Sequence, residues 1–180
     1  MQTFIALLRG INVGGHKKIK MAELRALCER LGFGNVRSYI QSGNLLLDSE
    51  EADTTMLEQR LKQGIAEEFG FDVPVLVLTR ARLERTASSN PFVNERNEDI
   101  KALYVAFLQE EPGEEEVSAL ELPKGCSDEM VMSGTEVYLF YPHGAGRSKL
   151  TNNTLEKKLK VAATTRNWKT VQALLSRVGT

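Results

Sequence analysis

The first 79 residues change repeatedly between strand-like and helix-like spacing of apolar positions. An apolar run starting at Thr3 breaks at Arg9, and apolar residues then recur every three or four positions from Met21 until Gly32. Such changes of period separate strands from amphipathic helices. The predicted elements are a strand over 3–9, a helix over 21–32, strands over 36–40 and 45–48 joined by a tight turn, a helix over 53–70 and a strand over 73–79.

This order of elements is that of a ferredoxin-like βαββαβ sandwich, in which helices cover one face of an antiparallel sheet. The second half partly repeats it, because the turn pairs Ser42-Gly43 and Ser133-Gly134 fall at equivalent places. Its predicted elements are a helix over 79–87, a strand over 101–108, a helix over 114–120, hairpin strands over 125–132 and 135–141, and helices over 148–160 and 167–178. We therefore predict an α+β fold with a ferredoxin-like subdomain over 1–79 and a related α+β subdomain over 80–180, packed as one compact unit.

The net charge of −1 conceals a strong segregation of charge along the chain. Residues 1–48 carry seven Lys and Arg against three Asp and Glu, and residues 143–180 carry eight against one. Residues 49–142 carry eight against twenty. Basic ends favour a local anion site where they meet, and an acidic middle disfavours non-specific binding to nucleic acid duplexes.

The bulk composition, 42% apolar and 26% charged, is that of an ordinary globular protein. Cys28 and Cys126 lack metal-type spacing, and two histidines do not complete a convincing zinc site. Cys28 lies on the apolar stripe of its predicted helix, which favours a buried thiol over a nucleophile. The first apolar run stops at Arg9, too early for a signal or membrane-spanning segment, so we expect a cytoplasmic protein with no membrane partner.

A loop rich in glycine and lysine follows the first predicted strand, within the stretch LLRGINVGGHKKIKM over 7–21. Glycines let backbone N–H groups turn toward an anion, and the N-terminus of the next helix adds its positive dipole end. The loop nearly fits the P-loop nucleotide pattern. However, His16 stands where lysine is required and Lys17 where a magnesium-binding hydroxyl is required, which excludes a standard nucleoside triphosphatase. Anion binding and a purely structural turn both stay open.

A second loop of the same kind, His143–Lys149, follows the last predicted hairpin. Arg147 offers a bidentate fork and Lys149 a point charge for phosphate or carboxylate, whereas Ser148 is alternatively only the N-cap of the next helix. The only tryptophan follows in the segment Thr164–Lys169, where it serves either as a core anchor or as a base-stacking surface. No catalytic triad is indicated, because neither histidine has a Ser or Asp partner that the sequence identifies.

Four segments resemble the signature blocks of a bacterial family, the domain of unknown function 1697. The blocks are Leu7–Gly15, Tyr39–Asn44, Gly144–Leu150 and Thr164–Trp168, and they span nearly the whole chain. The segment Asn90-Pro91-Phe92 also looks like a family block. The resemblance implies an α+β fold of ferredoxin-like subdomains and implies no established activity.

Polar residues dominate these blocks and fall in predicted loops, where core packing rarely needs them. We hypothesise that the two basic loops form one site for a phosphorylated or anionic ligand, either a nucleotide or other phosphorylated small molecule or a short single-stranded nucleic acid. The candidate ligand-binding residues are Arg9, Asn12, Gly14, Gly15, Lys18, Gln41, Ser42, Asn44, Gly146, Arg147, Ser148, Lys149, Arg166, Asn167 and Trp168.

Two alternatives stay open. In one, the protein is an interaction or structural module whose polar motif residues lock two subdomains together through buried hydrogen bonds. In the other, it is an enzyme acting on a small phosphorylated metabolite. The sequence identifies no catalytic residue, no cofactor and no metal ligand, and it does not indicate an oligomeric state.

Overall fold

The structure, a computed structural model, describes residues 1–179. The chain divides into two compact units, one formed by Met1–Glu84 with Leu174–Thr180 and the other by Arg85–Ala173. The division falls inside two helices, α3 (Arg80–Ser88) and α7 (Trp168–Val178). The expected boundary between segments 1–79 and 80–180 stays a prediction.

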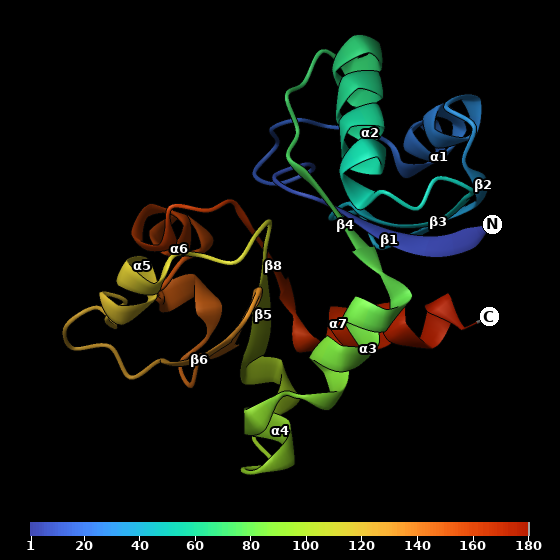
Figure 1. Cartoon of the computed structure of the whole chain (residues 1–180). Coiled ribbons are helices and arrows are strands. Elements are labelled where there is room, and N and C mark those ends of the chain that lie inside the picture. Colours follow the sequence, from blue (N-terminus) through green and yellow to red (C-terminus); the bar gives the residue numbers. More distant parts are fainter. Residues whose placement is uncertain (180) are drawn as a thin grey trace. The chain divides into compact units, whose positions relative to one another are not determined.

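The first unit contains one four-stranded sheet with the strand order β2-β3-β1-β4, and its strands pair antiparallel. Its elements before α3 are β1 (Gln2–Leu8), α1 (Met21–Arg30), β2 (Gly34–Tyr39), β3 (Asn44–Ser49), α2 (Thr54–Phe69) and β4 (Val75–Thr79). Figure 1 shows α1 and α2 side by side on the same face of this sheet. The order and the one-sided helices are those of a ferredoxin-like sandwich.

The apolar stripes of the two helices explain their placement. Leu24 and Leu27 of α1 and Leu57 and Leu61 of α2 are buried in one cluster with the inward-facing residues of the sheet. The ends of α2 follow standard capping chemistry. Asp53 accepts a hydrogen bond from the N–H of Thr55, and the helix ends in a left-handed residue at a glycine.

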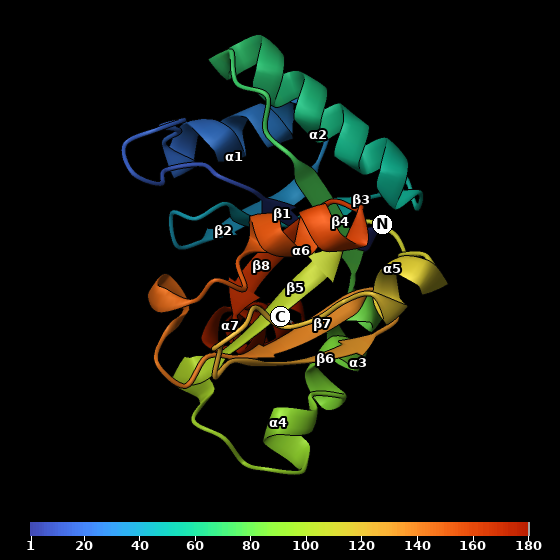
Figure 2. The ribbon, with the colours of Figure 1, turned by 90° about the vertical axis from the view of Figure 1, so that its left-hand side faces the viewer.

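The second unit repeats the same topology, with a four-stranded antiparallel sheet in the order β6-β7-β5-β8. Its elements are α4 (Pro91–Asn94), the short 3₁₀ turn η1 (Ile100–Ala102), β5 (Leu103–Leu108), α5 (Glu114–Ser118), β6 (Glu129–Ser133), β7 (Glu136–Phe140), the 3₁₀ turn η2 (Ala145–Arg147), α6 (Asn152–Leu159) and β8 (Ala163–Asn167). Figure 2 views this sheet from the side of α5 and α6. Each half of the chain thus reads βαββαβ followed by a helix, α3 in one half and α7 in the other.

The predicted α+β fold with antiparallel sheets is confirmed, and the suspected repeat is closer than the sequence indicated. Three predicted elements need correction. The strand β8 was expected to be loop, the strand predicted over 125–132 begins only at Glu129, and the helix predicted over 148–160 begins only at Asn152. The third difference has a clear cause, because Thr151 caps α6 by accepting a hydrogen bond from the N–H of Thr154.

Within the described residues, none of the helices is both long enough and apolar enough to cross a bilayer.

Candidate functional site

The loop between β1 and α1 is built on left-handed backbone. Gly10, Gly14 and Gly15 have φ of 74°, 58° and 78°, and the non-glycine residues Asn12 and Lys17 have φ of 54° and 45°. L-residues rarely adopt these angles, so the loop persists only where other contacts hold it. The fold therefore has to supply those contacts.

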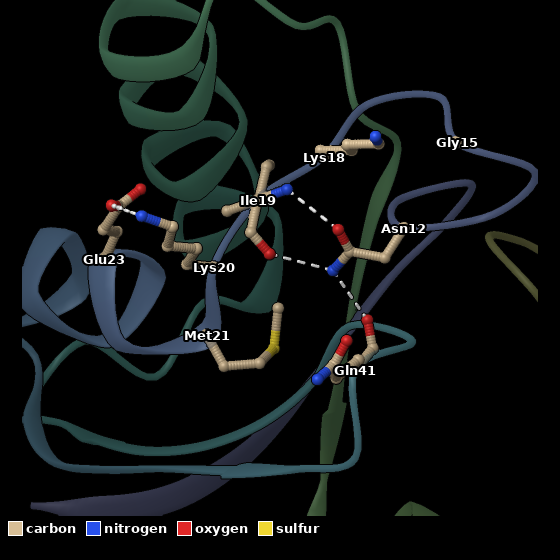
Figure 3. Close-up of a pocket in the computed structure, with 8 residues that line it drawn as sticks. All are labelled: Asn12, Gly15, Lys18, Ile19, Lys20, Met21, Glu23 and Gln41. Carbon is tan, nitrogen blue, oxygen red and sulfur yellow. Dashed lines mark hydrogen bonds and ion pairs between the residues drawn. The ribbon is translucent and has the colours of Figure 1, made fainter.

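The side chain of Asn12 supplies three of them. Its side-chain amide nitrogen donates to the carbonyl oxygens of Ile19 and Gln41, both at 2.9 Å, and its Oδ1 accepts from the N–H of Ile19 at 2.8 Å. Figure 3 shows this clamp between the loop and the turn that joins β2 to β3. Both amide hydrogens of Asn12 are used within the protein, so the amide group positions the loop.

The clamped loop borders a pocket of about 600 Å³. Figure 3 shows its lining residues, which come from the loop, the start of α1 and the β2–β3 turn: Asn12, Gly15, Lys18, Ile19, Lys20, Met21, Glu23 and Gln41. Of the predicted ligand-binding residues, the pocket brings together Asn12, Gly15, Lys18 and Gln41. The candidate residues named from the sequence do not include Ile19, Lys20, Met21 and Glu23.

The first turn of α1 faces this pocket without a side-chain cap. Lys20 occupies the N-cap position and makes no capping hydrogen bond, so the first N–H groups of the helix have no side-chain acceptor there. The ammonium of Lys20 pairs with the carboxylate of Glu23 at 3.4 Å, and both side chains are more than half exposed. The sequence carries no capping signal at this end of the helix, because Lys20 stands where Ser, Thr, Asp or Asn is expected.

Other residues predicted for this site have structural roles. Asn44 is fully buried and donates to the carbonyl of Tyr39 at 3.1 Å and to the hydroxyl of Ser42 at 3.0 Å. Its predicted contact with a ligand is therefore wrong, because it closes the β2–β3 turn from inside. Arg9 is half-buried where β1 ends, and its backbone N–H donates to the carbonyl of Pro74 at 3.0 Å, while the predicted ligand contact of its side chain stays a prediction.

The second glycine-rich loop belongs to the other unit and borders a pocket of about 340 Å³. Its lining includes three of the predicted ligand-binding residues, Arg147, Ser148 and Lys149. The other lining residues are Lys124, Gly125, Cys126, Ser127, Asp128, His143 and Gly144. Gly146 lies in the same loop, within η2. The prediction that this loop and the one after β1 share a single ligand stays a prediction.

Asp128 dominates the chemistry of this second pocket. It is only 7% exposed, and its Oδ2 accepts hydrogen bonds from the hydroxyl of Ser148 and from the thiol of Cys126, the latter at 2.8 Å. The hydroxyl of Ser148 also accepts from the N–H of Leu150 at 2.8 Å, so Ser148 braces the loop and is not the N-cap of α6. Lys124, Arg147 and Lys149 line the same pocket, so Asp128 offsets only part of its positive charge.

We expect Cys126 to react slowly with iodoacetamide near neutral pH. Partial burial and the hydrogen bond to Asp128 both raise the pKa of this thiol, and only the thiolate is the nucleophile. Replacing Asp128→Asn removes the negative charge, so the pKa falls toward its usual value and alkylation becomes faster. Mass spectrometry of the labelled protein measures the rate. Cys28, whose pKa burial raises to about 12, is the internal control that stays unmodified. If Cys126 is alkylated at the same rate in Asp128→Asn, the result contradicts the role of Asp128 in raising the pKa of this thiol.

The third predicted group, Arg166, Asn167 and Trp168, lies at the end of β8 and the start of α7. Trp168 is 2% exposed, so of the two roles that the sequence left open, core anchor or stacking surface, its burial favours the core anchor. Burial lowers the pKa of Arg166 to about 10, and its guanidinium donates to the carbonyl of Thr165 at 3.0 Å. Asn167 accepts the N–H of Thr170 at 2.8 Å and so caps α7.

The repeat allows the pocket beside α1 to be compared with its counterpart in the second unit. There, the loop after β5, the helix α5 and the β6–β7 turn line a pocket of about 400 Å³. This pocket is acidic, since it includes Glu111 and Glu114, and glutamates occupy the first turn of α5. The same position in the fold is therefore lysine-rich in one copy and glutamate-rich in the other.

Within residues 1–179, no group of three or more His, Cys, Asp and Glu side chains is arranged to hold a metal ion.

Comparison with known proteins adds a family and a fold relative. The family described as "Protein of unknown function (DUF1697)" matches residues 1–138. Among solved structures, the chain is similar to the conserved bacterial protein SP0830 from Streptococcus pneumoniae, with 25% sequence identity, a TM-score of 0.72 and 98% of each chain covered. No curated protein matches the sequence.

Proposed function

The chain belongs to the DUF1697 family, whose function is unknown, and from this starting point we propose that it binds the phosphate group of a small phosphorylated molecule in the pocket beside α1. The observation that carries the proposal is the uncapped first turn of α1, which faces a pocket lined by Lys18 and Lys20. Backbone N–H groups at a helix N-terminus bind anions because they combine free donors with the positive end of the helix dipole.

The electrostatics of the pocket support an anionic ligand. Lys18 is exposed, and its ammonium has no ion-pair partner within residues 1–179. Lys17, in contrast, donates to the backbone carbonyl of Asp72 and helps to hold the loop. The carboxylate of Glu23 is held by Lys20, so the pocket keeps the positive charge of Lys18 together with the helix N-terminus.

The size and walls of the pocket indicate how much of a ligand it accommodates. A volume of about 600 Å³ lies within the usual range for small-molecule sites. Ile19 and Met21 add apolar wall beside the polar end, which suits a ligand with a phosphate and a less polar body. The glutamate-rich counterpart in the second unit supports the same assignment, because a duplicated fold does not itself require lysine at this place.

We expect inorganic phosphate and pyrophosphate to bind the wild-type protein and Lys18→Ala to weaken that binding about fivefold, the loss typical of one exposed charge pair. Isothermal titration calorimetry measures the affinities. A higher salt concentration should also weaken the binding of phosphate to the wild-type protein, because exposed charges are screened.

The matched control is Lys62→Ala, which removes the same charge from the same unit. Lys62 is 55% exposed and pairs with Asp72 at 3.2 Å, and it does not line the pocket. The control variant should bind like the wild type. Equal losses in the two variants would show a general charge effect and would overturn the proposed site.

A further inference from the structure

A further pocket, in the second unit, lies where β5 begins and β8 ends. Antiparallel pairing brings these two strand ends together, with Tyr104 directly opposite Asn167. The pocket has a volume of about 450 Å³, and its lining comes from η1, these strand ends and the first turns of α7: Ile100, Lys101, Tyr104, Asn167, Lys169 and Gln172.

The lining combines an aromatic ring with two cations. Tyr104 is half-buried, and its ring packs edge-on against Tyr141 with centroids 5.2 Å apart, which fixes its orientation. Lys101 and Lys169 are exposed, and neither has an ion-pair partner within residues 1–179. The neighbouring carboxylate of Asp99 accepts the backbone N–H of Lys101. Ile100 adds an apolar edge that is 41% exposed.

The first unit provides an internal comparison, because it has a pocket of about 400 Å³ at the same place in its fold. Phe4 pairs with Thr79 there as Tyr104 pairs with Asn167. Thr79 caps α3 through the N–H of Arg82, just as Asn167 caps α7 through the N–H of Thr170. The two positions are therefore structurally equivalent.

The chemistry of the two equivalent pockets differs. In the first unit, Arg80 pairs with Glu84 at 2.7 Å, and the aromatic residue Phe4 is 1% exposed. The charges of Arg80 and Glu84 therefore neutralise each other, and the lining residues of that pocket include no aromatic side chain. In the second unit, Lys169 occupies the position of Ala81, and Gln172 occupies the position of Glu84. The charges of Lys101 and Lys169 therefore stay available for a ligand, beside the ring of Tyr104, which lines the pocket.

We propose that this second-unit pocket binds a planar aromatic molecule that carries a negative charge, of the kind that a nucleoside monophosphate represents. The planar ring stacks on Tyr104, Asn167 and Gln172 offer hydrogen bonds to its edge, and Lys101 and Lys169 hold the anionic group. The proposal is independent of the phosphate site beside α1, since no residue is shared.

The proposal is tested by titrating the full-length chain with adenosine 5′-monophosphate. The amide chemical shifts in NMR spectra report the binding. Saturable shifts are expected at Lys101, Tyr104, Asn167 and Lys169. Lys169→Ala should weaken binding at these amides about fivefold, the effect of one partly exposed charge. Tyr104→Leu should weaken it about tenfold, whereas Tyr104→Phe, which keeps the ring, should bind like the wild type.

Several controls keep the outcome decisive. Lys157→Ala removes an exposed cation of α6 outside the pocket and should change nothing. Adenosine and inorganic phosphate, tested separately, should each bind more weakly than the monophosphate. If Tyr104→Leu does not fold, Lys169→Ala decides alone. Wild-type affinity in Lys169→Ala, or shifts confined to the loop beside α1, would overturn this proposal, and the latter result would leave the phosphate site standing.

Discussion

Replacing Gly43→Ala is expected to lower the free energy of unfolding by about 2–4 kcal/mol, the combined cost of a left-handed L-residue and of an overpacked contact. Gly43 has a φ of 85°, and a Cβ there would lie 2.7 Å from the Cβ of Leu8 and 3.1 Å from two side-chain carbons of Ile11. The chain segments have no room to separate, because the carbonyl of Gly43 accepts the N–H of Leu8 at 2.7 Å.

The repeated fold supplies a matched control for this variant. Gly134 occupies the equivalent turn between β6 and β7 and has a φ of 58°, but a Cβ there would meet nothing within 4 Å. Gly134→Ala should therefore lose only the conformational part, about 1 kcal/mol. Urea unfolding of the two variants measures the difference. If both variants lose the same free energy of unfolding, the close approach of Gly43 to β1 does not explain why this turn needs glycine.

Replacing Trp168→Ala is expected to cost about 3–5 kcal/mol, the usual effect of removing a large buried aromatic side chain. Trp168 is 2% exposed, and its indole N–H has no hydrogen-bond partner among residues 1–179, so its contribution comes from packing. Trp168→Phe keeps most of that packing and leaves no polar group unsatisfied, and it should cost clearly less.

Thermal unfolding of both variants checks this order. The intrinsic fluorescence of the native protein gives a second measurement, since Trp168 is the only tryptophan in the chain. A buried indole should emit at short wavelength and resist quenching by acrylamide. Ready quenching, together with an unaltered melting temperature for Trp168→Ala, would restore the stacking surface and contradict the core assignment.

Apolar periodicity was enough to predict the first unit. Its helices and strands bury long, regular sets of Leu, Ile, Val and Phe, and the Asp53 cap and the terminal Gly70 mark the ends of α2 in the sequence. Local signals of this kind depend on neighbouring residues, which a single sequence contains.

The strand β8 could not be found in this way, because its sequence ATTRN has almost no apolar alternation. Its pairing with β5 holds it in place, and Thr165 donates from its hydroxyl to the side chain of Asn152 on α6 at 2.7 Å. These are tertiary contacts, so propensity alone does not show them.

The candidate site was predicted only in part, because contacts between residues distant in the sequence also hold its loops. Glycine and lysine in the loop after β1 indicated the pocket, and Lys18 and Gln41 were included. The sequence did not show that Asn12 reaches Gln41 or that Ser148 reaches Asp128, 29 and 20 positions away. Polar motif residues therefore divide into those that brace loops, such as Asn12, Asn44 and Ser148, and those that stay exposed, such as Lys18.

Phosphate binding at the first turn of α1 is tested most directly by titrating the isotope-labelled full chain with inorganic phosphate and following its backbone amides by NMR. The largest saturable shifts are expected at Met21, Ala22 and Glu23, whose N–H groups begin the uncapped helix, and at Lys18. The corresponding amides of α5, Glu114–Glu116, provide the internal reference and should not respond. Shifts concentrated in the loop Gly144–Lys149, or no saturable shift at α1, would contradict the proposed site.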